Sequence, residues 1–192
     1  MKMFSSLASF QAAAAQDADS KVIEKIEKAG GSVRQIAQND DRREVDFHLQ
    51  GAAITDEHLA AAATLKRVVH LHLGGTSVTD AGLTNLKALG DLTQLHLENT
   101  KITDKGLAQV KLLKNLTYLN LYNTGVTDAG IASLTGLTNL KNLYIWQTKI
   151  TPAGVDKLKK ALPKLDIVTG WELEKKAPET KEPEKKEPEK KP

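Results

Sequence analysis

The chain contains no cysteine among its 192 residues, which excludes disulfide bonds, thiolate metal sites and cysteine nucleophiles. It also has no run of about 18 or more apolar residues, so we expect no membrane span. The 27 basic residues are nearly balanced by 24 acidic ones and nowhere cluster with aromatic residues. We therefore expect no nucleic-acid interface.

Both ends of the chain differ in composition from the middle. Residues 1–20 carry Lys2, a short apolar stretch and then small residues, which is the order of parts in a secretory signal peptide. A disordered leader is the alternative, so export to the periplasm and a cytoplasmic location both stay open. Residues 172–192 alternate lysine and glutamate with proline and lack the apolar area that a core requires, so we expect a disordered tail.

The middle of the chain repeats itself every 24 residues, the spacing from Val68 to Leu92 and from Leu92 to Leu116. These copies share the frame L-x-x-L-x-L-x-x-T-x-[IV]-T-D-x-G-[LI]-x-x-[LV]-x-x-L, with Val68 in the first leucine position. A period of this length is typical of solenoids, in which each repeat buries its apolar face only by stacking on its neighbours.

Two further copies depart from the frame. Residues 140–164 have Pro152 where the other copies have aspartate. Residues 44–67 have His58 in place of glycine, and we place Phe47 and Leu49 in the two core positions of the strand. We interpret residues 44–67 as a degenerate first repeat, and residues 44–171 as five repeats plus a closing strand.

The frame predicts one strand and one short helix in each repeat. Leucines two residues apart point to the same side of a strand, and the later apolar set recurs every three residues, as on one helix face. Between them, the Thr-Asp pairs can cap the free N–H groups of the helix, and the following glycine relieves crowding. The predicted fold is an α/β right-handed solenoid with a parallel sheet on its concave face and short helices on its convex face.

The segment before the repeats, residues 21–43, is predicted to be an N-terminal cap. Val22, Ile23 and Ile26 have helical spacing, and Gly30 follows them as a helix terminator. Val33 and Ile36 are expected in or near an edge strand. Such a cap covers the apolar end that the first repeat would otherwise expose.

The T-D-x-G-L signature resembles the cysteine-containing, ribonuclease-inhibitor-like class of leucine-rich repeats, and in particular small bacterial leucine-rich-repeat proteins. The sequence differs from that class in having threonine at the turn position usually held by asparagine or cysteine, at Thr76, Thr100, Thr124 and Thr148. A threonine hydroxyl can still bond to backbone there. The resemblance implies that the concave surface binds a protein partner, and we expect a monomer.

Counting along each strand identifies the residues that face the concave side. The third positions are Asp46, His70, Gln94, Tyr118 and Asn142; the fifth are His48, His72, His96, Asn120 and Tyr144; the seventh are Gln50, Gly74, Glu98, Tyr122 and Trp146. Aromatic residues are favoured at binding hot spots. We therefore predict a binding platform at Tyr118, Tyr122, Tyr144 and Trp146, with Asn120, His72 and His96 beside it.

The predicted partner is a protein or peptide, and a carbohydrate stacking on the rings is a further possibility. The alternative is that the concave face only tolerates these rings, or that Trp171 and the tail cover them. The residues on this face do not by themselves identify the partner.

Histidine is concentrated on the same face, where His48, His72 and His96 form one predicted row. A metal site built from this row is one alternative function, although the outer two histidines start about two strand spacings apart. A stalk or spacer role is another. No serine falls on the concave positions, and Glu98 with His72 or His96 is the only acid–base pair available. We expect neither an enzyme nor a cofactor.

Overall fold

The computed structural model describes residues 18–170, so the expected tail, residue Trp171 and most of the expected leader lie outside the described residues. The chain forms a seven-stranded sheet in which the strands follow one another in chain order. The strands are β1 Ser32–Gln35, β2 Arg43–Asp46, β3 Val68–His72, β4 Gln94–His96, β5 Tyr118–Asn120, β6 Asn142–Tyr144 and β7 Asp166–Val168. Strand β1 pairs antiparallel with β2, and all later pairs are parallel.

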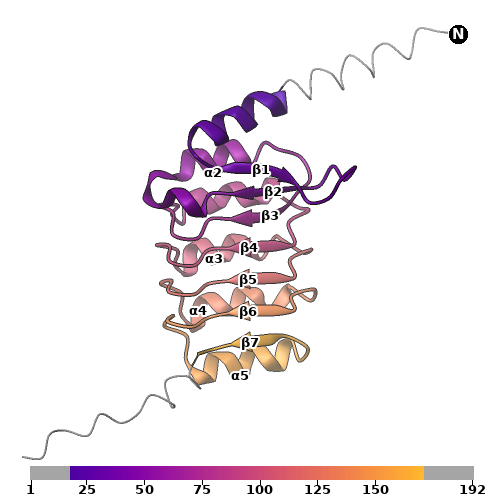
Figure 1. Ribbon diagram of the computed structural model, residues 1–192. Coiled ribbons are helices and arrows are strands. Elements are labelled where there is room, and N and C mark those ends of the chain that lie inside the picture. The colour runs from indigo at the N-terminus through magenta and orange to yellow at the C-terminus, as the bar shows by residue number, and fades with distance from the viewer. Residues whose placement is uncertain (1–17, 171–192) are drawn as a thin grey trace, which may run out of the picture.

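Short helices connect the parallel strands and lie on one side of the sheet, as Figure 1 shows. They are η1 His48–Ala53, α2 Asp56–Ala62, η2 Gly82–Ala88, α3 Asp104–Val110, α4 Asp128–Ile131, η3 Ala132–Gly136 and α5 Pro152–Ala161. A further helix covers residues 18–28 and precedes β1. No helix within the described range is long and apolar enough to cross a membrane.

The core lies between the sheet and the helices and is built from the predicted leucine rows. Leu71, Leu95, Leu119 and Leu143 are partners across the strands, and each is fully buried. Strands β4, β5 and β6 each bury their central residue while the residues on both sides remain partly exposed. One side of the sheet is therefore core, and the other is partly exposed to solvent. This is the α/β leucine-rich-repeat solenoid that the period predicts.

The first repeat differs from the predicted register by two residues. Val45, and not Phe47, is the partner of Leu71, and the N–H of Phe47 donates to the carbonyl of His72 one step further on. The reason is a longer turn: seven positions separate Phe47 from Ile54, whereas five separate Leu73 from Val78. Helix η1 takes up the additional residues, and Leu49, expected in the core, is 80% exposed.

Aspartates link each repeat to the next. The carboxylates of Asp56, Asp80, Asp104 and Asp128 accept hydrogen bonds from the backbone N–H, at 2.8 Å, and from the hydroxyl of a threonine one repeat further along, Thr79, Thr103, Thr127 and Thr151 respectively. We call this the Asp–Thr ladder. Thr103, Thr127 and Thr151 do cap their own helices, as expected, whereas Thr79 accepts the N–H of Ala81, just before η2 begins. The aspartates bond to the neighbouring repeat instead.

The same ladder explains the glycine of the signature. A Cβ added at Gly82, Gly106, Gly130 or Gly154 would overlap the aspartate carboxylate of the preceding repeat. The glycine therefore leaves the space through which the carboxylate reaches its threonine. The sequence predicted that glycine relieves crowding at the start of the helix. The structure shows that this crowding comes from the aspartate of the preceding repeat.

The two atypical residues stand at the two ends of the ladder. Thr55 holds the ladder position of the first repeat, and its N–H donates to Nδ1 of His58 at 3.1 Å, so the imidazole takes the place of a preceding aspartate. At the other end Pro152 replaces the aspartate that would bond to a further repeat, and it begins helix α5. Neither residue interrupts the ladder.

The threonines at the turn position bond within their own repeat, as predicted. The hydroxyls of Thr76, Thr100, Thr124 and Thr148 each donate to the carbonyl three residues earlier at 2.6–2.7 Å. These bonds satisfy carbonyl groups at the ends of the strands, where a buried unpaired oxygen would be unfavourable.

Candidate functional site

One side of the sheet lies opposite helices α2 to α5. On this side each of strands β2 to β7 presents two residues of the strand and the residue two places after them. We call this side the open face. Strand register and the hydrogen bonds that continue it give these residues: Glu44, Asp46 and His48; His70, His72 and Gly74; Gln94, His96 and Glu98; Tyr118, Asn120 and Tyr122; Asn142, Tyr144 and Trp146; Asp166, Val168 and Gly170.

Four rings on consecutive strands follow one another across the open face, and we call them the ring ladder. The rings are stacked from His72 to Tyr118 and tilted by 41° between Tyr118 and Tyr144. The ring centres lie 3.9 Å apart between His72 and His96, 4.7 Å between His96 and Tyr118, and 5.3 Å between Tyr118 and Tyr144. Because stacked rings cover one another's faces, a partner meets mainly ring edges. A flat sugar needs a free ring face, so this arrangement does not favour the carbohydrate alternative.

Tyr122 and Trp146 form a second, separate ring pair, with centres 5.3 Å apart. The structure thus brings Tyr118 to Tyr144 and Tyr122 to Trp146. Asn120 holds the turn beside them, since its Oδ1 accepts a hydrogen bond from the N–H of Tyr122 at 3.0 Å. The contact between the tyrosines and the histidines was missed from the sequence, although both kinds of ring stood on neighbouring strands of the predicted sheet.

Trp146 is more enclosed than its position in the repeat suggests. Its Nε1 is buried and has no hydrogen-bond acceptor among the described residues. A Cβ on Gly170 would overlap the indole, so the backbone of the last described residue packs against the ring. Trp146 therefore contributes to packing at the C-terminal end of the sheet as well as to the open face.

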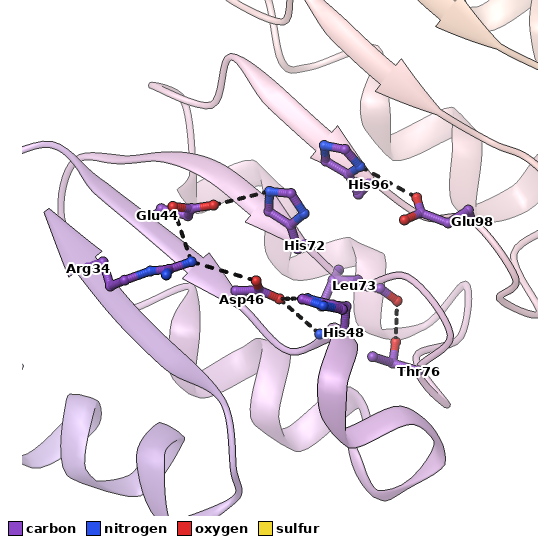
Figure 2. A network of polar contacts seen from close by, with 9 residues as sticks. All are labelled: Arg34, Glu44, Asp46, His48, His72, Leu73, Thr76, His96 and Glu98. Carbon is purple, nitrogen blue, oxygen red and sulfur yellow. Dashed lines mark hydrogen bonds and ion pairs between the residues drawn. The ribbon is translucent and has the colours of Figure 1, made fainter. Parts of the chain in front are cut away.

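The two stacked histidines each approach a carboxylate (Figure 2). His72 Nε2 lies 3.3 Å from Glu44 Oε1 on one side, and His96 Nδ1 lies 3.6 Å from Glu98 Oε2 on the other. The longer separation exceeds a hydrogen bond, and Glu98 Oε2 is buried without a hydrogen-bond partner among the described residues. The Glu98 side chain lies over Gly74, where a Cβ would overlap its carboxylate.

A second group of charges borders the open face at its N-terminal end. His48 Nδ1 lies 2.6 Å from Asp46 Oδ1, and the same carboxylate accepts the backbone N–H of His48. From β1, an Arg34 guanidinium nitrogen lies 3.6 Å from Glu44 and 3.9 Å from Asp46. Figure 2 shows Arg34 reaching both carboxylates from the adjoining strand.

Burial and neighbouring charges shift the protonation of these groups. Burial, with the nearby His96 second, lowers the pKa of His72, and burial likewise lowers the pKa of His70. Burial alone would raise the pKa of Glu98, but the adjoining His96 imidazole, together with a backbone hydrogen bond and His72, outweighs burial and holds that pKa below its usual value. At neutral pH the carboxylate is therefore charged, and His70 and His72 are neutral.

The predicted row of His48, His72 and His96 does not exist. His48 lies in η1 after β2, two places along from the position expected, and its ring centre is 6.5 Å from that of His72. Asp46 occupies the place in β2 beside His72. Among residues 18–170 no group of three or more histidines, aspartates or glutamates could hold a metal ion, so the metal-binding alternative has no support.

Glu44 is a residue of the open face that the sequence reasoning missed. The two-residue slip in the first repeat placed Asp46 where Glu44 lies, at the partner position of His70. A usable signal was present, because Val45 and Phe47 are two residues apart and apolar. They fit the core positions better than Phe47 with Leu49, and Val45 and Phe47 are both fully buried.

A family model described as "Leucine Rich repeat" matches residues 91–109 and 113–134, which belong to neighbouring repeats. No curated protein is significantly similar to the chain in sequence. The match agrees with the repeat frame and with the strand–helix order of the structure.

Solved structures of bacterial leucine-rich-repeat proteins are similar to the chain. An internalin from Listeria monocytogenes is 26% identical over 57% of this chain, with a TM-score of 0.50. Internalin C2 from the same organism is 20% identical over 65% of this chain and 69% of its own, with a TM-score of 0.45. A leucine-rich-repeat protein from Leptospira interrogans is 24% identical over 58% of this chain and 33% of its own, with a TM-score of 0.40. The chain spans only 30% of the first internalin's length.

Proposed function

We propose that this leucine-rich-repeat protein is a non-catalytic interaction module that binds a protein or peptide through its open face. The observation that carries the proposal is the ring ladder with its neighbouring Tyr122–Trp146 pair. Both lie on the side of the sheet that the helices leave free, and tyrosine and tryptophan are the residue types that most often dominate binding energy at interfaces.

The binding residues proposed are Tyr118, Tyr122, Tyr144, Trp146, Asn120, His72 and His96. Their rigidity supports the assignment, because rings that are already packed on one another lose little conformational freedom when a partner arrives. The parallel strands that carry these rings repeat at about 4.8 Å. An extended or looped polypeptide can follow such a regular surface.

The repeat class is also a proposal. We infer the ribonuclease-inhibitor-like class from the T-D-x-G signature. The Asp–Thr ladder supports this assignment, since it gives each residue of the signature except the variable one a task in joining neighbouring repeats.

Site-specific photocrosslinking tests the proposed face. A photoreactive amino acid replaces Gln94, which lies on the open face in β4, and in a matched variant it replaces Lys87, which is exposed on η2 across the same part of the solenoid. In extract of the native host, the open-face position should capture one partner that the Lys87 position does not. A partner captured equally well from Lys87, or from Lys87 alone, would contradict the proposal.

A further inference from the structure

The open face lacks basic residues, although the chain as a whole is basic. None of the residues that make up this face is lysine or arginine, whereas the chain has 27 such residues and a formal charge of +3. The face does carry the carboxylates of Glu44, Asp46, Glu98 and Asp166. The open face therefore carries carboxylates and no lysine or arginine, while all 27 lysines and arginines lie elsewhere in the chain.

The groups near these carboxylates neutralise them only in part. His72 and His70 are largely uncharged at neutral pH, because burial lowers the pKa of each. Arg34 lies 3.6 Å from Glu44 and 3.9 Å from Asp46, and its side chain is 61% exposed, so the pairing is loose and reaches only the N-terminal border. No arginine or lysine contact with Glu98 is found within residues 18–170.

Glu98 is the carboxylate at the centre of the face. It stands in one row with Tyr122 and Trp146 on the next two strands. Hydrogen bonds from the N–H groups of Asn99 and Asn123 to the carbonyls of Tyr122 and Trp146 keep this row in register. Its side chain is 24% exposed, and its Oε2 has no hydrogen-bond donor among the described residues. The next neighbour in the row is an aromatic ring.

A planar cation fits this row. A guanidinium can donate a hydrogen bond to a carboxylate and at the same time lie against an aromatic ring. Glu98 and Trp146 are two strands apart, about 10 Å, which about three extended residues of a bound segment would span. A segment could thus bind Glu98 with a basic side chain and contact the Tyr122–Trp146 pair with its next residues.

We propose that the segment bound by the open face is cationic, with an arginine or lysine side chain paired to Glu98 beside Tyr122. The inference rests on the proposed function, and it adds the chemistry of the partner. Charge complementarity carries it, since a surface with carboxylates and without lysine or arginine attracts a positively charged chain and disfavours an acidic one.

Titration of the full chain with three capped peptides tests the inference. Each peptide alternates glycine with one other residue, arginine in the first, glutamine in the second and glutamate in the third. Amide chemical shifts in NMR spectra report where each peptide binds. At low salt the arginine peptide should bind best and shift the amides of β4 to β6, and added salt should weaken its binding.

Two matched variants isolate the carboxylate. Glu98→Gln should weaken binding of the arginine peptide about fivefold, the effect of one partly exposed ion pair, while Glu57→Gln on the helix side should leave it unchanged. Both substitutions keep the side-chain shape, and equal unfolding midpoints for the two variants and the wild type would show that the fold is intact.

The outcomes separate the two proposals. Equal binding of the glutamine peptide on the same strands would overturn the cationic partner and leave the proposed function standing. The cationic partner is also overturned if the arginine peptide fails to bind at low salt, binds away from the open face, or binds Glu98→Gln as well as wild type. The crosslinking contrast between Gln94 and Lys87 tests the proposed function by itself.

Discussion

The imidazole rings of His72 and His96 lie on neighbouring strands with their centres 3.9 Å apart and their planes within 14° of parallel. Two rings this close cannot both be protonated without strong repulsion. The pair therefore makes the open face sensitive to pH, and it lies at the start of the ring ladder that continues into the tyrosines.

Acid should destabilise the fold through His72. Its pKa is lowered in the folded state, so below the ordinary value of 6.5 the unfolded chain binds more protons, and stability falls as pH falls through this range. The charged groups around the ring affect its pKa in opposite directions. The carboxylates of Glu44, Asp46 and Glu98 favour the protonated imidazole, whereas Arg34 from β1, His48 from η1 and His96 from β4 disfavour it. Glu98 and Asp46 have lowered pKa values too, and their stabilisation is lost only in stronger acid.

Urea unfolding between about pH 7.5 and about pH 5.5 measures this effect. The His72→Gln variant should lose less stability over the range than wild type. His58→Gln, which changes a histidine on the helix side, is the comparison. Equal slopes for wild type and His72→Gln would show that the stacked pair does not control the pH response.

Gly106→Ala should destabilise the protein by about 2 kcal/mol, since the added methyl group would overlap the Asp80 carboxylate that holds Thr103. Gly90→Ala is the matched control, because a Cβ there has nothing within 4 Å. The control should be neutral or slightly stabilising. Unfolding free energies of the two variants test the pair, and equal losses would refute the role given to the signature glycine.

Asp104 and Thr127 should be energetically coupled across their repeat boundary. Asp104→Ala removes the acceptor of both the Thr127 N–H and its hydroxyl, so we expect a loss of about 1–3 kcal/mol. Thr127→Val keeps the N–H bond to Asp104 but removes the hydroxyl bond and the cap on the Ala129 N–H. A double-mutant cycle should give losses that do not add, with a coupling of at least about 0.5 kcal/mol. Additive losses would mean that the ladder contributes little.

Tyr122 should be the main contributor to partner binding. Tyr122→Ala is expected to weaken binding of the captured partner by about thirtyfold, the effect of one hot-spot side chain, whereas His48→Ala at the border should have much less effect. Trp146→Ala is a less specific test. Its ring is partly buried against Gly170, so the substitution should lower stability as well as affinity. An unchanged dissociation constant for Tyr122→Ala would argue against this face.

The 24-residue frame was sufficient to predict the parallel strands, the leucine rows and the helices on one side, because each follows from a strict period. The first repeat was predicted less well. Leu49 has the spacing of a core leucine, and a frame of constant length cannot show that the turn after Phe47 holds two additional residues. The prediction still assigned the residues of β2 to the correct faces of the sheet, because a shift of two residues along a strand leaves each side chain on the same face.

The side-chain contacts were the part least accessible from the sequence. The Thr-Asp pair matched a helix cap, which is a local pattern, whereas the aspartate bonds to a residue 23 positions ahead. Counting named the open-face residues of β3 to β6 correctly. In the first repeat it gave Gln50 and missed Glu44, and it did not name Asp166, Val168 and Gly170 at the last strand. Which rings stack depends on how side chains lean between strands, so the joining of His96 to Tyr118 was not predictable from spacing.

The Asp–Thr ladder determines how the number of repeats can change in evolution. Every internal copy provides an aspartate for the threonine of the next repeat and a glycine that leaves room for the aspartate of the preceding repeat. Duplication of residues 92–115 would therefore insert a unit that makes both contacts with its neighbours. The outermost copies cannot be moved inward so easily: a duplicated Pro152 would leave one threonine without its carboxylate, and a duplicated His58 would fill the gap that an aspartate needs. Gene duplication can therefore lengthen this solenoid from its interior more easily than from its ends.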